Sequence, residues 1–250
     1  MRARSSEGVW GPWSRVFSFS ARAPAVPLDV TAHFDPAART VTLRWERGKG
    51  GATPVRYLIF GSTEQGFTAS AEPYRYNAGK DGIKNASANL LLETKTSVTS
   101  WKIPTPLWRP YYRVAAVDEA GHQSESSDMA HLNHPLVLTR QLPEADTGAD
   151  YHARIGVSAS IGHLVYRESK SGEVNSFQGG DELAFAVTGA PPGLAIDKNT
   201  GLLAGFLPAK AAGRYKIKIS VSDQRTGAND SVELVLRVRK KRQGTSAGPP

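Results

Sequence analysis

The chain has 250 residues, of which 40% are hydrophobic and 22% are charged, with 24 glycines and 16 prolines. This length suits two domains of ordinary size, and the composition is that of a folded, turn-rich protein rather than a disordered one. The lack of cysteine excludes disulfides, thiolate zinc sites and cysteine nucleophiles. No stretch is long and apolar enough for a membrane-spanning segment, and the first residues lack the apolar core of a signal peptide.

The net charge of +8 would favour acidic partners such as nucleic acid, anionic polysaccharide or a lipid surface. Part of this charge lies at the C-terminal end, in a run that includes Arg239, Lys240, Lys241 and Arg242. The run enters a segment rich in Gly and Pro, and no aromatic-basic motif accompanies it. We therefore expect a solvated basic tail and no specific nucleic-acid binding.

Alternation of apolar and polar residues dominates the chain, and no long segment has the apolar spacing of a helix. In the first half, Val41, Leu43 and Trp45 share one face of a predicted strand. Strands with turn residues beside them are predicted at 40–45, 56–60 and 112–117. Three such strands are typical of a β-sandwich.

The second half repeats this pattern. A strand is predicted at 181–187, followed by the extended Pro191-Pro192-Gly193 and a tight turn at 197–201. Two longer strands then place their apolar residues on one face, namely Tyr215, Ile217, Ile219 and Val221 in the first and Val232, Leu234, Leu236 and Val238 in the second. These elements predict a second sandwich.

The first group of strands resembles a fibronectin type III domain. The resemblance is carried by Pro27–Val30, Leu43–Trp45, Tyr57–Phe60 and Tyr112–Gly121. The tyrosine that opens the sixth strand in that family would fall at Pro110, and the segment 61–100 is longer than the family requires. Residues before this domain resemble the last hairpin of another domain of the same kind.

The second group resembles the Ig-like and cadherin-like (dystroglycan-type) domains of bacterial modular exoproteins, through residues 189–205 and 213–223. We expect an all-β fold of two tandem immunoglobulin-like β-sandwiches, with an unassigned insertion near 161–180. The expected parts are a terminal hairpin or extension at 1–24, the fibronectin-like domain at 25–130, a linker at 131–135, the second domain at 136–240 and a disordered tail at 241–250.

No pattern in the sequence indicates a catalytic site, because neither a phosphate loop nor a nucleophile elbow is present. His131 and His134 are close in sequence but are expected to be polar residues of a linker. We therefore expect no enzymatic activity. The alternative is an accessory part of a polysaccharide-degrading enzyme, with paired carboxylates drawn from the two insertions. The candidates are Glu64, Asp81, Glu93, Glu168 and Glu173.

The cadherin-like resemblance implies calcium between modules, bound by carboxylate oxygens. Asp181, Glu182 and Asp223 are the candidate ligands, and the alternative is that they form turns. Apart from this calcium, we expect no cofactor.

Aromatic residues in loop-like sequence could stack on sugar rings. Trp101, Trp108, Tyr74 and Tyr76 are the candidates, and the alternative is that they pack in the core.

Together these observations favour a non-catalytic spacer or interaction segment of a larger exported or cell-surface protein. It could support polysaccharide binding, and a calcium-dependent adhesion module is the competing hypothesis. The expected partners are other modules of the same parent chain, and beyond them a polysaccharide or a cell-surface protein.

Overall fold

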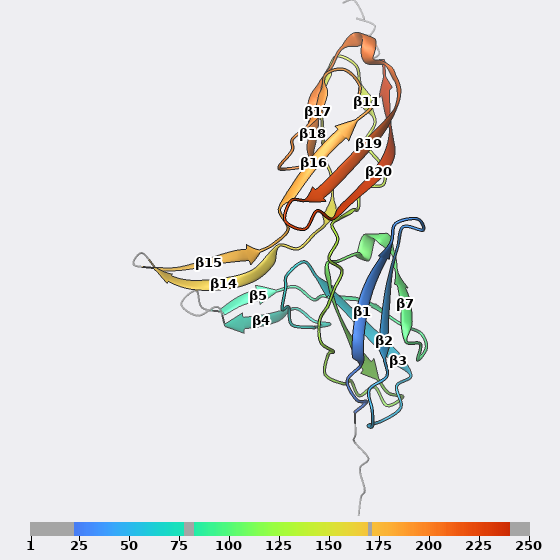
Figure 1. Ribbon diagram of the computed structural model, residues 1–250, viewed down its shortest axis with the longest axis vertical. Coiled ribbons are helices and arrows are strands. Elements are labelled where there is room, and N and C mark those ends of the chain that lie inside the picture. Colours follow the sequence, from blue (N-terminus) through green and yellow to red (C-terminus); the bar gives the residue numbers. More distant parts are fainter. Residues whose placement is uncertain (1–22, 78–82, 170–171, 241–250) are drawn as a thin grey trace, which may run out of the picture.

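The computed structural model describes residues 23–77, 83–169 and 172–240. Within these ranges the regular elements are strands and two short 3-10 helices, η2 (Thr105–Leu107) and η3 (Ala209–Ala211). Figure 1 shows two β-sandwiches joined end to end, with hairpins projecting sideways from the junction. The prediction of an all-β fold with tandem immunoglobulin-like sandwiches is confirmed. No helix in the described ranges is long and apolar enough to cross a membrane.

The first sandwich consists of two antiparallel sheets. One has the order β1 (Leu28–Asp35), β2 (Thr40–Glu46), β7 (Ser100–Ile103), and the other has the order β6 (Leu90–Glu93), β3 (Arg56–Ser62), β8 (Tyr111–Val117), β9 (Ala130–His131). The alternation predicted for residues 40–45 is observed, since Val41, Leu43 and Trp45 are buried in the core between the sheets. Thr42 and Arg44 face away from it.

A tyrosine corner is present in this sandwich, although the resemblance to fibronectin type III domains places the corner tyrosine at Pro110. The backbone N–H of Arg109 donates to the Tyr112 hydroxyl oxygen at 2.7 Å. Tyr112 is fully buried, and burial raises its pKa above the ordinary value of 10. The corner is therefore formed two residues later than the family pattern places it, where β8 has already begun.

The second sandwich also has two sheets. They have the orders β11 (Ala145–Asp146), β20 (Asn229–Arg239), β19 (Gly213–Asp223), β16 (Leu183–Thr188) and β12 (Ala149–Arg154), β18 (Leu202–Leu207), β17 (Leu194–Ile196). A short pair, β10 (Leu136–Val137) with β13 (Val157–Ser158), closes the end near the first sandwich. The faces predicted for 215–221 and 232–238 meet in register, with Ile217 opposite Leu234.

Both insertions fold as β-hairpins. The hairpin of the first sandwich is β4 (Tyr74–Asn77) and β5 (Ile83–Ala86), and that of the second is β14 (Gly162–Ser169) and β15 (Gly172–Gly179). They project from the same side of the molecule (Figure 1). Gly162 has a φ of +86°, and a Cβ there would collide with the carbonyl oxygen of Gln178. This position therefore requires glycine.

The chain passes from one core to the other within β10. Leu136 is buried in the core of the first sandwich, and the next residue, Val137, is buried in the core of the second. The segment expected to be a linker packs on the first sandwich: His131 belongs to β9, and Leu132 is buried. The described structure therefore gives the two sandwiches almost no connecting chain that could act as a hinge.

Candidate functional site at the junction of the sandwiches

Arg39 lies at the tip of the β1–β2 hairpin, beside the second sandwich. The Asp35 carboxylate stabilises this turn by accepting the backbone N–H groups of Ala37 at 2.9 Å and Ala38 at 3.1 Å. Arg39 ends the turn with a φ of +47°, a left-handed conformation that costs a non-glycine residue roughly 1 kcal/mol. This backbone directs the side chain across the junction rather than along its own sheet.

The Arg39 guanidinium forms a two-pronged ion pair with Asp230 at the start of β20. Nη1 donates to Oδ1 at 2.7 Å, and Nη2 donates to Oδ2 at 2.9 Å. Nη1 also donates to the carbonyl oxygen of Ser231 at 2.9 Å. The Asp230 side chain is only 5% exposed, and its Oδ2 also accepts the backbone N–H of Val137 at 2.8 Å. One carboxylate thus joins the first sandwich, the crossover strand and the second sandwich.

Aromatic rings of the first sandwich lie beneath two arginines at the junction. The Arg39 guanidinium carbon is 5.8 Å from the ring centre of Phe34 and 5.9 Å from that of Trp108. Arg140, from the second sandwich, lies 5.2 Å from the ring centre of Trp108 and donates to the Thr105 hydroxyl at 3.3 Å. These cation–π contacts add to the ion pair.

A second contact joins the sandwiches through buried polar groups. The hydroxyls of Tyr111 and Ser160 lie 2.7 Å apart, and the Tyr111 ring stacks on His131 at 4.5 Å. The backbone N–H of Ser160 donates to Asp181 Oδ2 at 2.8 Å, which fixes Ser160 in place. Burial lowers the pKa of His131, against the attraction of Asp181, and burial raises the pKa of Asp181.

A third contact is made by backbone at the base of the β14–β15 hairpin. The N–H of Ile161 donates to the carbonyl oxygen of Thr63 at 2.9 Å. The N–H of Gln65 donates to the carbonyl oxygen of Gly162 at 2.8 Å. These bonds form a short parallel bridge between a loop of the first sandwich and the start of β14. The junction is therefore held at separate places, which opposes both twisting and bending.

The predicted calcium ligands lie where strands begin or end, at the same end of the second sandwich: Asp181 and Glu182 directly precede β16, and Asp223 is the last residue of β19. Asp223 Oδ1 accepts the N–H groups of Glu182 at 3.0 Å and Arg225 at 3.1 Å, and its Oδ2 accepts the Thr226 hydroxyl at 2.6 Å. Asp181 Oδ2 accepts the hydrogen bond from the backbone N–H of Ser160 that is described above. No group of three or more metal-ligating side chains is found in the described parts of the chain.

The four aromatic residues predicted to bind sugars have different surroundings. Trp108 is 1% exposed, and its indole N–H donates to the carbonyl oxygen of Ile103 at 2.9 Å, so it is a core residue and not an exposed stacking surface. Trp101 is half-buried on β7 against the same core. Tyr74 lines a groove between the β4–β5 hairpin and the rest of the first sandwich. Tyr76 lies on the same strand, with its side chain outside the described residues.

The carboxylates of the enzymatic alternative are not paired where they are described. Glu64 lines the groove beside Tyr74, where burial raises its pKa, and it is the only carboxylate among the described residues that line this groove. Glu93 pairs with Arg56 at 3.2 Å on the surface. Glu168 and Glu173 lie opposite each other on β14 and β15, with side chains outside the described residues, and Asp81 lies outside them altogether.

Comparison with known proteins finds one family model that is similar to part of this chain. Residues 156–238 match the family model described as Putative Ig domain. The second sandwich is immunoglobulin-like. The match runs from just before β13 through β20 as far as Val238, so it includes Asp230 but not the first sandwich. The fibronectin type III resemblance of residues 25–130 stays a prediction.

Solved structures give weak likenesses. The endo-fucoidan hydrolase MfFcnA4 of glycoside hydrolase family 107 is 17% identical over 90% of this chain and 30% of its own, with a TM-score of 0.29. Drosophila N-cadherin EC1-4 is 13% identical over 86% and 50%, with a TM-score of 0.29. The fibronectin(III)-like modules of Clostridium thermocellum CbhA are 12% identical over 85% and 95%, with a TM-score of 0.25.

The chain spans between 17% and 31% of the first three solved structures that it matches. No curated protein matches it.

Sequence reasoning missed the residues that form the junction. Arg39 and Asp230 are separated by 191 positions, and each lies in sequence that resembles an ordinary turn or strand start. One weak signal was present: Arg39 follows an Asp-Pro-Ala-Ala turn that exposes it at the tip of a hairpin. That signal predicts exposure, not a partner.

Proposed function

We propose that this chain is a non-catalytic segment of a larger modular protein, exported or at the cell surface, that holds two β-sandwich modules in one relative orientation. The observation that supports this best is the ion pair between Arg39 and Asp230. A flexible spacer would need a free linker between its domains, whereas here the chain changes cores between Leu136 and Val137. The fibronectin-like and cadherin-like identities of the two modules are part of this proposal.

The energetics favour a fixed junction. Rotating one sandwich against the other would leave the Asp230 carboxylate buried without its guanidinium partner, and removing one member of such a pair typically costs ~2–5 kcal/mol. Arg39 is about a quarter exposed, with 26% of its side chain accessible, so the lower end of that range applies. The contacts of Tyr111 with Ser160 and of Thr63 with Ile161 would break in the same motion.

The test is differential scanning calorimetry of the whole chain and of Arg39→Ala. We expect the wild type to unfold in one transition that includes both sandwiches, because the junction couples them. In the Arg39→Ala variant, the free energy of unfolding should fall by about 2 kcal/mol, and the calorimetric trace should resolve into two transitions. Arg44→Ala, which removes an exposed arginine of the same hairpin, is the matched control and should unfold like the wild type. Two independent transitions in the wild type would refute the proposal.

A second candidate function is polysaccharide binding at the groove beside the β4–β5 hairpin. This groove has a volume of about 420 Å³ and combines the Tyr74 side chain with Glu64, Asn89 and Arg109. An aromatic ring with polar neighbours in a groove suits a sugar chain. In titrations with neutral and anionic polysaccharides, Tyr74→Ala should weaken binding about tenfold, as expected for ~1.4 kcal/mol. Arg75→Ala, which changes the exposed residue next to Tyr74, should leave binding unchanged. An equal loss of affinity in both variants would argue against binding in this groove.

A further inference from the structure

Strand β20 is paired along only part of its outer edge. On its inner side it pairs with β19 from Asn229 to Val238. On its outer side the parallel strand β11 pairs only with Val238 and Arg239. In the described structure, no strand pairs with the outer edge between Ser231 and Arg237. A row of backbone groups is therefore left open there.

The direction of these groups follows from the two ends of the edge. The Ser231 carbonyl oxygen accepts from Arg39 at 2.9 Å, and the Arg239 carbonyl oxygen accepts the Thr147 N–H at 2.8 Å. Since alternate residues of a strand direct their backbone groups to the same edge, the N–H and C=O groups of Glu233 and Val235 also point outward. None of the described backbone bonds satisfies them on that side.

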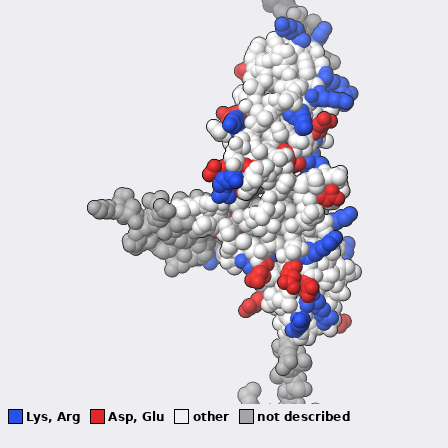
Figure 2. Space-filling view, in the orientation of Figure 1, with Lys and Arg blue, Asp and Glu red and all other residues white. Residues whose placement is uncertain are grey.

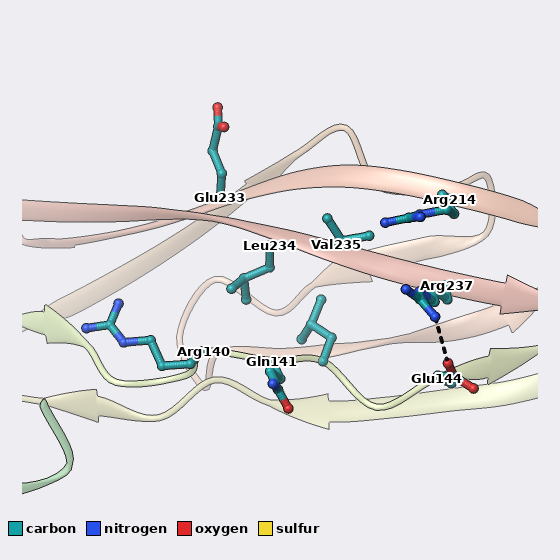
Figure 3. Close-up of a pocket in the computed structure, with 9 residues that line it drawn as sticks. Arg140, Gln141, Glu144, Arg214, Glu233, Leu234, Val235 and Arg237 are labelled. Atoms are coloured by element: carbon teal, nitrogen blue, oxygen red, sulfur yellow. Dashed lines mark ion pairs between the residues drawn. The ribbon is translucent and has the colours of Figure 1, made fainter.

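A groove runs along this open edge. It has a volume of about 490 Å³ and lies between β20 and the segment 140–144, as Figure 3 shows. The segment is held in its detour because Leu142 is buried in the core and the Tyr151 hydroxyl donates to the Pro143 carbonyl oxygen at 3.2 Å. Val235, with 43% of its surface exposed, supplies an apolar floor. The groove is thus a built feature of the fold rather than a gap between mobile loops.

The charge of the groove is positive. Its lining includes Arg140, Arg214 and Arg237 against Glu144 and Glu233. The Glu144 carboxylate forms ion pairs with Arg239 at 3.0 Å and with Arg237 at 3.8 Å. Figure 3 shows the pair with Arg237. Figure 2 shows basic side chains along the margin of the second sandwich. An occupant with carboxylates would therefore be favoured over a basic or neutral one.

We propose that the open edge of β20 between Ser231 and Arg237 is a docking site for an extended acidic segment of a partner protein, which adds to the sheet as a strand. The backbone groups of Glu233 and Val235 supply the affinity, and the arginines select for acidic side chains. At ~3.4 Å per residue the open edge accommodates roughly five residues. This site lies outside the spacer role and does not depend on it.

The experiment measures binding of a short synthetic peptide in which glutamate alternates with valine, followed by amide NMR and hydrogen exchange on the whole chain. We expect the amides of Glu233 and Val235 to shift and to become protected, and binding to weaken as salt is added. A peptide with lysine in place of glutamate should bind at least tenfold more weakly.

Two variants separate backbone pairing from charge. Val235→Pro removes an outward N–H without breaking a bond to β19, and it should abolish peptide binding. Arg214→Glu leaves the backbone intact and should weaken binding about tenfold, so the proposal can still be tested if the proline variant fails to fold. Lys216→Ala, an exposed residue of β19 outside the groove, is the matched control.

The proposal is overturned if the lysine peptide binds equally well, if no amide of β20 becomes protected, or if neither variant changes the affinity. Binding of an anionic polysaccharide in place of the peptide, without protection of Glu233 and Val235, would also overturn it. Failure of the calorimetric test on Arg39 would not overturn this site, because Glu233, Val235 and Arg214, on which the binding test rests, all lie in the second sandwich.

Discussion

At the scale of single residues, both carboxylate oxygens of Asp223 accept hydrogen bonds from within the second sandwich. The residue is 1% exposed, and its oxygens accept bonds from Glu182, Arg225 and Thr226. Burial alone would raise its pKa, but the Thr226 hydroxyl and the two backbone amides hold that pKa below its ordinary value of 3.8. Its oxygens are therefore committed to the β19–β20 turn, which favours the turn-forming alternative over a calcium ligand.

This arrangement predicts a pH-dependent contribution to stability. A carboxyl whose pKa is lower in the folded state stabilises the fold above its unfolded pKa and loses that effect as pH falls through the folded pKa. Asp223→Asn should therefore lower the free energy of unfolding by about 1–3 kcal/mol near neutral pH. The difference from wild type should shrink below pH ~4. Urea melts across this range measure it.

The same melts examine the calcium hypothesis. If calcium raises the midpoint of the wild type and this rise is lost in Asp223→Asn, the residue binds the ion and the turn-forming interpretation is incorrect. A stability difference that does not change with pH would contradict the assigned cause of the pKa shift.

At the scale of elements, sequence periodicity predicted the strands that carry each core. β2, β19 and β20 were anticipated because one face of each is apolar and the other polar, and this contrast is set by burial on one side only. The insertion hairpins were not anticipated, and in the described structure β14 and β15 form a two-stranded sheet of their own, apart from the sheets of either sandwich. The sequence indicated insertions there but not their form.

Two other differences also have physical causes. Trp108 was predicted to lie in loop-like sequence, with packing in the core as the alternative, and its ring is buried with its indole N–H donating to the Ile103 carbonyl oxygen. The corner tyrosine is Tyr112, because the corner requires a tyrosine hydroxyl within hydrogen-bond distance of an upstream backbone N–H, here that of Arg109. The pair of Arg39 and Asp230 could not be predicted at all, since it depends on how two separately folded sandwiches meet.

At the scale of the whole molecule, the junction holds the two sandwiches in one relative orientation. Contacts at Arg39, Tyr111 and Thr63 hold the junction on different elements, so no single bond could serve as a hinge while the others stay intact. In such an arrangement the hairpins that project from the junction (Figure 1) would keep their direction relative to both modules.

The most direct measurement is the distance between spin labels placed on the two sandwiches. Because the chain has no cysteine, labels attach only to introduced ones, and the exposed Lys95 and Lys210 are suitable positions for Lys95→Cys and Lys210→Cys. A fixed junction predicts one narrow distance distribution, which broadens when Arg39→Ala is added to the labelled chain. A broad distribution that Arg39→Ala leaves unchanged would show that the sandwiches move independently and would contradict it.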